Sequence, residues 1–485
     1  MGVDEKALDE IILRLEKEVA SRPKDMGIRL QLALSYMKRA RRDEAIRELG
    51  AVISQEKKSV EAHYYLGIVY ADAGDADKAQ ESFEKAVALD RKHGPSHYFL
   101  GKIMAMRGNI DAAINETEKA VESTPGNAMA HSQLGELYIA KGRAADAGVH
   151  WQKVLEIDPS NLQALHNLGA LYTDSQQYDK AVDFLTRAEH LGSENPGLYY
   201  NLGICYYVTK RLDKSLAALK KATDREPENL VTLTTLGEVY AASGDVEKAI
   251  EVWDQALALK PDSVFPTYNL GLAFFQKGQR EEAVKLWEKC LTFDPTYVPA
   301  YRNLATAAVI AGDLGGAIAR WEALATIMPG SPEPGLSLGD LCFRNGEYDK
   351  AEVYVADLTA KLAEAQDQAA LREIRSSVEL LFGTILIAKG KARDGVAHWA
   401  KSMEVDPNFA LANGTFISRS IWGELVEQAK AAAKTEEQRK AAGLVGSLVK
   451  EETKPPASSK GAGATPAGER SEKKGGLPWF SRAKK

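Results

Sequence analysis

A leucine recurs at every thirty-fourth position through most of this 485-residue chain. Ten positions share this spacing without an insertion or deletion between them: Leu32, Leu66, Leu100, Leu134, Leu168, Leu202, Leu236, Leu270, Leu304 and Leu338. A small residue follows each leucine, and a second small residue stands twelve positions after the first. A fixed period of this length is the signature of repeat architectures, in which each unit packs mainly on its neighbours. The chain is therefore predicted to fold as a stack of equivalent units.

Each unit reads as a pair of helices joined by a tight turn. The first helix carries the Leu-Gly pair, and the second carries the later small residue, such as Ala79 after Gly67. Between them stands a glycine, which suits a residue just past a helix end because it adopts positive φ without strain. These turn glycines are Gly74, Gly108, Gly142, Gly244, Gly278, Gly312 and Gly346. Prolines such as Pro125 and Pro159 recur near the end of the period, where they stop the second helix.

This pattern strongly resembles the tetratricopeptide repeat. The family's Leu-Gly, Tyr, Ala, bulky apolar and Pro positions are met, for instance, by Leu236, Gly237, Tyr240, Ala249, Trp253 and Pro261. The resemblance implies an all-α fold, a right-handed superhelical solenoid of antiparallel helix pairs with N- and C-terminal capping helices and a disordered C-terminal tail. Tryptophans in the bulky second-helix position are predicted to belong to the core: Trp151, Trp253, Trp287, Trp321 and Trp399.

The period also divides the chain. Residues 1–25 are predicted to form an N-terminal capping helix, in which Ile11 and Leu15 keep the phase of a lone second helix. Ten in-phase repeats follow at 26–365, then an insertion at 366–375 and a degenerate eleventh repeat at 376–409, in which Phe382 and Gly395 replace the expected Leu and Ala. Residues 410–450 are predicted to form C-terminal capping helices. Residues 451–476, rich in Pro, Gly, Ser, Lys and Glu, are expected to be a disordered linker, and 477–485 form an apolar and basic C-terminal motif.

Charge and cysteine content exclude several classes of protein. The formal net charge is −6, and residues 451–485 hold eight Lys or Arg against four Asp or Glu, so the remainder is more acidic still. A nucleic-acid binder would carry a concentrated basic face. The start of the chain lacks the features of a signal peptide, and Cys205, Cys290 and Cys342 are too far apart for a disulfide framework or metal knuckle. We therefore expect a cytoplasmic protein.

No sequence motif indicates catalysis. Gly335 to Gly339 matches the G-x-S-x-G nucleophile elbow, but that elbow requires a preceding strand, and here Leu338 and Gly339 are the tenth Leu-Gly pair. His63, His97 and His131 share one position of the period, where neighbouring equivalent helices are separated by about 10 Å, so packing or surface roles are favoured over a shared metal ion. We expect no enzyme activity, no cofactor and no metal.

The resemblance places function on the first helices, which in this family line a concave groove that receives an extended peptide or a helix. The fifth, ninth and twelfth positions of the period face that groove in the family. Here they are often aromatic or apolar, as binding hot spots generally are. The predicted groove residues at these positions are Tyr64, Tyr98, Tyr200, Ile204, Tyr207, Tyr268, Leu272 and Phe275, with Phe265 nearby. Lys102 and Arg302 are isolated, which argues against a clamp for acidic C-termini.

The sixth position of the period holds a column of asparagines, Asn167, Asn201, Asn269 and Asn303. An amide both donates and accepts, so such a column suits contact with a ligand backbone. It resembles the asparagine ladder of O-linked N-acetylglucosamine transferases, although asparagine is also common there in ordinary repeats.

A last feature is the end of the sequence, where Leu477, Trp479 and Phe480 are followed by Arg482, Lys484 and Lys485. We interpret these residues as a docking motif for an aromatic groove, in the same or another copy, or for an anionic membrane surface. The leading hypothesis is a protein-interaction scaffold or adaptor for peptide or helical segments of partners. Two alternatives stay open, a substrate-recruiting subunit of a separate enzyme and a membrane-proximal assembly factor tethered through its tail.

Overall fold

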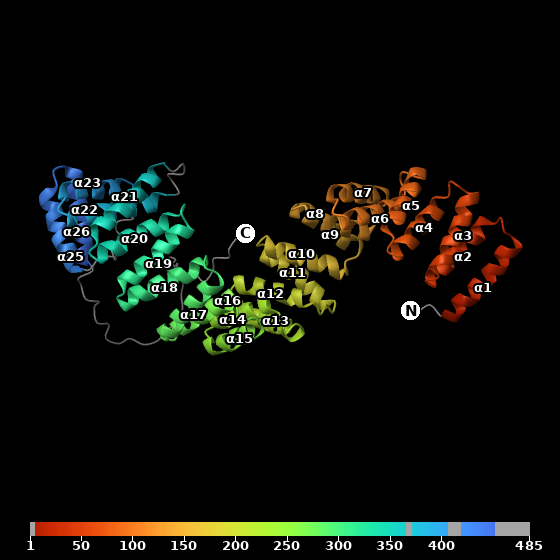
Figure 1. Cartoon of the computed structure of the whole chain (residues 1–485), viewed down its shortest axis with the longest axis horizontal. Coiled ribbons are helices and arrows are strands. Elements are labelled where there is room, and N and C mark those ends of the chain that lie inside the picture. The colour runs from red at the N-terminus through yellow and green to blue at the C-terminus, as the bar shows by residue number, and fades with distance from the viewer. Residues whose placement is uncertain (1–4, 365–370, 406–418, 452–485) are drawn as a thin grey trace. The chain divides into compact units, whose positions relative to one another are not determined.

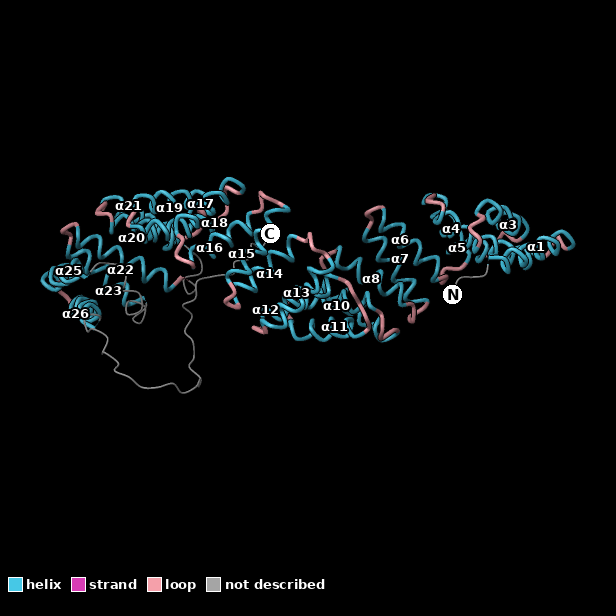
Figure 2. The backbone as a smooth tube through the Cα atoms, turned by 90° about the horizontal axis from the view of Figure 1, so that it is seen from below, coloured by secondary structure: helices cyan, strands magenta, loops and turns pink. Residues whose placement is uncertain are grey.

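The computed structural model describes residues 5–364, 371–405 and 419–451, and these ranges fold into helices and connecting turns without a strand (Figures 1 and 2). The first helix of every predicted repeat begins on the period of the leucines. These first helices are α2 (Met26–Lys38), α4 (Val60–Asp72), α6 (Gly94–Met106), α8 (Ala128–Ala140), α10 (Leu162–Asp174), α12 (Pro196–Val208), α14 (Leu230–Ala242), α16 (Val264–Gln276), α18 (Val298–Ala311) and α20 (Pro332–Arg344).

The second helices keep the same period. They are α3 (Arg42–Gln55), α5 (Ala76–Leu89), α7 (Ile110–Ser123), α9 (Ala144–Ile157), α11 (Tyr178–His190), α13 (Leu212–Arg225), α15 (Val246–Leu259), α17 (Arg280–Phe293), α19 (Leu314–Ile327) and α21 (Tyr348–Glu364). The remaining helices are α1 (Glu5–Ser21), α22 (Arg372–Ala388), α23 (Ala392–Val405), α25 (Arg419–Ala432) and α26 (Glu436–Glu451). In every repeat the two helices pack on each other, which confirms the all-α architecture of paired helices.

The chain divides into two compact units, residues 1–293 and 294–485. Within the first unit, each second helix also packs on the first helix of the next repeat, as α13 does on α14 and α15 on α16. Figure 1 follows this succession from α1 to α17 as the colour runs from red to green. Within the second unit, the same alternation runs from α18 to α23, and α25 and α26 cover α23.

Short polar side chains start the first helices. Asn127, Asn161, Asn195 and Asn229 stand at N-cap positions one period apart, and each side-chain oxygen accepts from a backbone N–H in the first turn. Such a cap satisfies one of the backbone donors that the helix leaves without a partner, which contributes about 1 kcal/mol. The N-cap hydrogen bond therefore recurs with the same 34-residue period as the helices.

The Leu-Gly pair leaves space for a bulky residue of the second helix. A Cβ atom added at Gly237 would overlap the indole of Trp253, and one at Gly271 would overlap that of Trp287. The indole N–H groups donate to backbone carbonyls of the first helix, Trp253 to Thr234 at 3.0 Å and Trp287 to Tyr268 at 3.3 Å. The second helix thus inserts its largest side chain where the first helix has none.

One tryptophan departs from this arrangement. Trp151, Trp253, Trp287 and Trp399 are buried, as predicted, whereas Trp321 is only partly buried against the core. The residue after the leucine in that repeat is Ala305 in place of glycine. Because Ala305 carries a methyl group that is absent from the repeats of the four buried tryptophans, we attribute the shallower position of Trp321 to this substitution.

Positive φ marks the turn between the two helices in all ten repeats. All seven predicted turn glycines have φ between 73° and 88°, and Ala40, Gln176 and Lys210 adopt φ of 59–63° at the equivalent position of the other three repeats. Two backbone hydrogen bonds close each turn, as from Gly142 N to Ile139 O at 2.9 Å and from Arg143 N to Tyr138 O at 2.8 Å. The hairpin therefore imposes the left-handed conformation even on residues with a side chain.

Helix α1 covers the first repeat of the first unit, and α25 and α26 cover α23 of the second unit. Helix α1 packs on α2 through Leu8, Ile12, Leu15 and Val19, while Ile11 stays 39% exposed. Ile11 occupies the position of the period that holds the small second-helix residue in the repeats, as Ala45 does in the first repeat. In a complete repeat, this position faces the first helix of the same pair. Helix α1 has no such partner, so the side chain remains at the surface. Leu425, Val426, Ala441 and Val445 of α25 and α26 are buried at the other end.

The eleventh helix pair packs more closely than its degenerate sequence suggests. Gly383 of α22 and Gly395 of α23 face each other, and an added Cβ at either would overlap the carbonyl oxygen of the other. Ser376 and Ser402 also exchange buried hydrogen bonds of 2.7 and 3.1 Å between side chain and backbone. Helix α22 begins at Arg372, inside the predicted insertion. The linker 451–476, apart from its first residue, and the motif 477–485 lie outside the described residues.

Candidate functional site

Large apolar side chains are exposed on four of the five first helices from α8 to α16, the exception being α10. We define the first-helix face as positions 2, 5, 6, 9, 12 and 13 of α8, α10, α12, α14 and α16, which helical periodicity places on one side. The most exposed apolar residues on this face are Met129 (65%), Phe265 (60%), Val231 (59%), Val208 (44%) and Ile139 (44%). Concentrated exposed apolar groups mark interaction sites, whereas single ones are ordinary.

The same five helices contain no lysine and no arginine. Their only Asp or Glu residues are Glu136, Asp174 and Glu238. The second helices of the same repeats carry three to six charged residues each, of both signs. The first-helix face is therefore apolar, aromatic and weakly acidic.

Glu238 connects three successive first helices. Its Oε1 accepts from the Nδ2 of Asn269 on α16 at 3.2 Å. On the other side lies Tyr207 of α12, whose pKa is raised by burial and, to a lesser extent, by the charge of Glu238. A carboxylate held between two neighbouring helices fixes their spacing, because moving either helix would leave a partly buried charge with fewer partners.

A similar pair lies earlier on the chain. Burial raises the pKa of Tyr98 on α6, and the charge of Glu136 on α8 raises it further.

Tyr64 of α4 lies in an aromatic cluster, with its ring centroid 6.0 Å from Phe83 and 6.1 Å from Phe99. Tyr64 therefore contributes to packing between repeats as well as to the surface.

The predicted groove residues differ in exposure. Phe265 is exposed, and a larger group is partly buried: Tyr64, Tyr98, Asn167, Tyr200, Asn201, Tyr268, Leu272, Phe275 and Asn303. Asn303 belongs to the second compact unit and the others to the first. Ile204, Tyr207 and Asn269 are instead buried, at 9%, 7% and 7% exposure. The structure corrects the prediction at these three positions, because their side chains pack between helices and leave little surface for a partner.

The asparagine column is not a uniform ladder. Asn167 accepts from Gln163 on its own helix at 2.9 Å, whereas Asn269 donates to Glu238 on the preceding first helix. Gln133, at the same position of α8, has both amide atoms buried without a hydrogen-bond partner. The column therefore serves several local roles.

The column of His63, His97 and His131 joins each first helix to the loop before it. The Nε2 of His97 lies 3.0 Å from the Arg91 carbonyl oxygen, and that of His131 lies 3.1 Å from the Pro125 carbonyl oxygen. In three other repeats this position of the period holds Arg29, Tyr199 or Tyr301. Each of these side chains donates a hydrogen bond to the backbone carbonyl oxygen six residues earlier. Five side chains of three types serve one structural purpose, which sequence reasoning missed because no single residue type marks it.

The candidate catalytic motif is part of a helix. Ser337 lies inside α20, so it occupies no strand-to-helix turn. The three cysteines are buried, and burial raises the pKa of the Cys290 thiol to about 12 and that of Cys342 to about 11. Thiols with raised pKa are poor nucleophiles.

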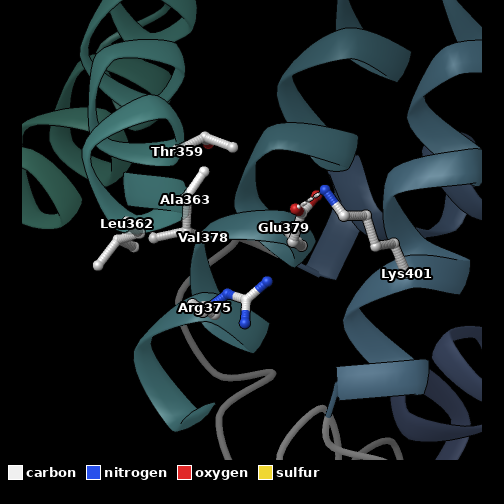
Figure 3. A pocket seen from close by; sticks show the side chains of 7 residues that line it. All are labelled: Thr359, Leu362, Ala363, Arg375, Val378, Glu379 and Lys401. Atoms are coloured by element: carbon white, nitrogen blue, oxygen red, sulfur yellow. Dashed lines mark ion pairs between the residues drawn. The ribbon is translucent and has the colours of Figure 1, made fainter. Parts of the chain in front are cut away.

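A small hollow lies between α21, α22 and α23 (Figure 3). Its volume is about 40 Å³, enough for a few water molecules and far below that of small-molecule sites. Glu379 forms an ion pair with Lys401 there, and His398 Nδ1 lies 2.6 Å from the same carboxylate. The hollow is a packing defect beside a satisfied ion-pair cluster.

In the ranges that the structure describes, no three His, Cys, Asp or Glu side chains gather as ligands for a metal ion. No helix in those ranges has both the length and the apolar character needed to cross a bilayer.

Comparison with known families and structures agrees with the fold. Models of the tetratricopeptide repeat match residues 30–94, 70–137, 150–183, 196–229, 268–297 and 308–374, and a TPR repeat model matches 237–278. No curated protein matches the sequence.

Several solved structures are similar to parts of the chain. One is MamA, at 27% identity over 33% of this chain and 94% of that chain, with a TM-score of 0.32. Another is YrrB, described as a TPR protein with an unusual peptide-binding site, at 23% identity over 39% of this chain and 96% of that chain, with a TM-score of 0.36. A third is PilF of Pseudomonas aeruginosa, at 18% identity over 46% and 99%, with a TM-score of 0.40. Family models thus cover most of the paired helices that the structure contains, and the chain belongs to the tetratricopeptide repeat family.

Proposed function

We propose that this protein is a non-catalytic interaction scaffold of the cytoplasm, which binds extended or helical segments of partner proteins along the first-helix face. The observation that carries the proposal is the set of exposed apolar residues on this face, three of them on the neighbouring helices α12, α14 and α16: Val208, Val231 and Phe265. Partly buried Tyr200 and Tyr268 lie on the same face.

The face has a rigid support, which favours binding. Buried Trp253 and Trp287 hold the second helices against α14 and α16, and Glu238 spaces α14 from α16 through Asn269. A surface that is already ordered loses little conformational entropy when a partner binds, so more of the contact energy contributes to affinity.

The test compares two matched double variants of the full chain. Val231→Ser with Phe265→Ser removes exposed apolar groups from the first-helix face, and Val149→Ser with Leu259→Ser removes groups of 56% and 45% exposure from second helices. We expect the first variant to lose captured proteins in affinity purification while its helicity, measured by circular dichroism, stays unchanged. The second variant should retain them.

Equal capture by both variants would contradict the proposal. The nature of a captured protein also separates the narrower hypotheses. An enzyme lost with the first variant would indicate a recruiting subunit. Sedimentation of the full chain with liposomes would instead favour a membrane-proximal assembly factor.

A further inference from the structure

We propose that the first-helix face selects a segment in which large apolar residues are followed by Lys or Arg, and that residues 477–485 of this chain are such a segment. This inference rests on the proposed function and names the chemistry of its ligand. The occupant is Leu477-Pro478-Trp479-Phe480-Ser481-Arg482-Ala483-Lys484-Lys485, in the same chain or in a second copy.

The apolar half of the segment matches the most exposed part of the face. Trp479 and Phe480 are large side chains that gain most from leaving water, and aromatic anchors dominate binding energy. Phe265 and Val231 stand at the same position of neighbouring repeats, with 60% and 59% of their surface exposed. The partly buried rings of Tyr200 and Tyr268 extend this apolar surface toward the middle of α12 and α16.

The charges are complementary as well. Glu136 is exposed on α8 and Asp174 on α10, and neither forms an ion pair with a described residue. Other exposed carboxylates of the same unit do have cationic partners from the next repeat, as Asp179 has Arg211 at 2.9 Å and Glu247 has Lys277 at 3.3 Å. Because α8, α10, α12, α14 and α16 contain no Lys or Arg, the face attracts a cationic ligand without a competing cation of its own.

The position of the segment in the chain favours self-recognition. It follows α26 in the chain. Residues 451–485 contain eight Lys or Arg against four Asp or Glu. A segment tethered to its own receptor is present at high effective concentration when the connecting chain spans the distance between them. An acidic first unit and a basic terminal segment thus belong to one chain.

The direct test is fluorescence anisotropy with a labelled peptide of residues 471–485. The receptor is the full chain carrying Trp479→Ser and Phe480→Ser, so that its own segment does not compete. Adding Val231→Ser and Phe265→Ser to this receptor should weaken binding about tenfold or more, as expected for the loss of anchor contacts. Asp174→Asn should weaken it about two- to fivefold, and less at high salt. The control substitutions Val149→Ser and Leu259→Ser should leave binding unchanged.

Two changes in the ligand sharpen the test. Replacing Arg482, Lys484 and Lys485 by Gln should weaken binding in low salt, and replacing Trp479 and Phe480 by Ser should abolish it. The chain with its native segment should bind the labelled peptide more weakly than the receptor variant. Light scattering then separates the two arrangements, because docking between copies raises the mass with concentration and docking within one chain does not.

A peptide library displayed on phage distinguishes failure of this inference from failure of the proposed function. Enrichment of apolar and basic peptides that the face substitutions abolish supports both. Enrichment of peptides without that pattern, still dependent on Phe265, overturns the inference and leaves the proposed function in place. No dependence on the face overturns both. Binding of the 471–485 peptide that is equal in the face and control variants also overturns the inference.

Discussion

The two helices of repeats four to eight are similar in length and opposite in chemistry. Helices α9, α11, α13, α15 and α17 carry three to six charged residues each, whereas α8, α10, α12, α14 and α16 carry one carboxylate or none. The first helices supply the glycines, and the second helices supply the bulky residues that fill the space, such as Trp253 against Gly237. Each of these first helices therefore packs closely against its paired second helix and exposes little surface to solvent. Part of that exposed surface is apolar.

Carboxylates illustrate the difference. At the start of the second helix α15, the N-cap residue Asp245 has a lowered pKa because Lys248 donates to it at the surface. On the first helix α20, burial raises the pKa of Asp340 to about 6, although Arg344 Nη1 lies 3.6 Å away. The surroundings of each carboxylate therefore favour the ionised form of Asp245 and disfavour that of Asp340. A first-helix face that carries few charges is consistent with binding, since contact with a partner desolvates each charge placed there.

Glycine substitutions should separate the two kinds of helix most strongly. Gly237→Ala places a methyl group into the indole of Trp253, whereas an added Cβ at Gly50 of the second helix α3 meets nothing within 4 Å. We expect Gly237→Ala to lower the free energy of unfolding by about 2–3 kcal/mol and Gly50→Ala to raise it by about 0.5–1 kcal/mol. Urea unfolding followed by circular dichroism measures both. The same sign for the two variants would remove the distinction between the helices.

The partly buried carboxylate of Asp340 on α20 should make stability depend on pH. A raised pKa in the folded state means that the folded protein binds more protons than the unfolded chain between about pH 4 and pH 6, so stability falls as pH rises through that window. Asp340→Asn should remove this slope and stabilise the protein at pH 7.5 by about 1–2 kcal/mol. Unfolding midpoints at pH 4.5, 6 and 7.5 report the slope. A steeper dependence in the variant would contradict the assignment.

The turns between the two helices should give a smaller effect. Lys210 adopts φ of 63°, whereas the equivalent Gly244 has φ of 88°. Lys210→Gly should raise the free energy of unfolding by up to about 1 kcal/mol, because glycine has no Cβ strain in this conformation. Gly244→Ala should lower it by a similar amount. Thermal unfolding of the two variants side by side tests whether the turn conformation is set by the fold.

Ion pairs at the surface of the second helices should contribute least. The side chain of Lys248 is exposed and that of its partner Asp245 is partly exposed, and such pairs contribute about 0–1 kcal/mol because solvent screens them. Lys248→Gln should change the free energy of unfolding by less than about 0.5 kcal/mol. A loss above about 1 kcal/mol in the same urea experiment would show that second-helix charge also stabilises the stack.

The fold was largely predictable because each 34-residue segment carries the same pattern of leucine, small residues and turn residue. Ten first helices begin one period apart, and the turn glycines have the positive φ that was expected of them. The exceptions arise where one unit differs from its neighbours. Ala305 leaves Trp321 only partly buried, and Ile11 is exposed because α1 lacks a first helix of its own.

The candidate site was less predictable, since the period fixes which side of a helix a residue occupies but not how closely the next helix approaches. Tyr200 and Tyr207 lie on the same helix, and both were predicted to contact a partner. Tyr200 remains partly exposed, whereas Tyr207 is buried beside Glu238 of the following first helix. No local sequence pattern separates these two tyrosines.

The sequence by itself determined the repeat, the helix pairs, their turns and, in repeats four to eight, the contrast between highly charged second helices and sparsely charged first helices. These features depend on local periodicity, glycine placement and side-chain chemistry, which each repeat carries within its own segment of chain. Only the tertiary structure decided that Ile204, Tyr207 and Asn269 are core while Val231 and Phe265 are surface. The physical reason is that burial on a first helix depends on the distance to the next repeat. Contacts made across repeats, such as that between Asn269 and Glu238, set this distance.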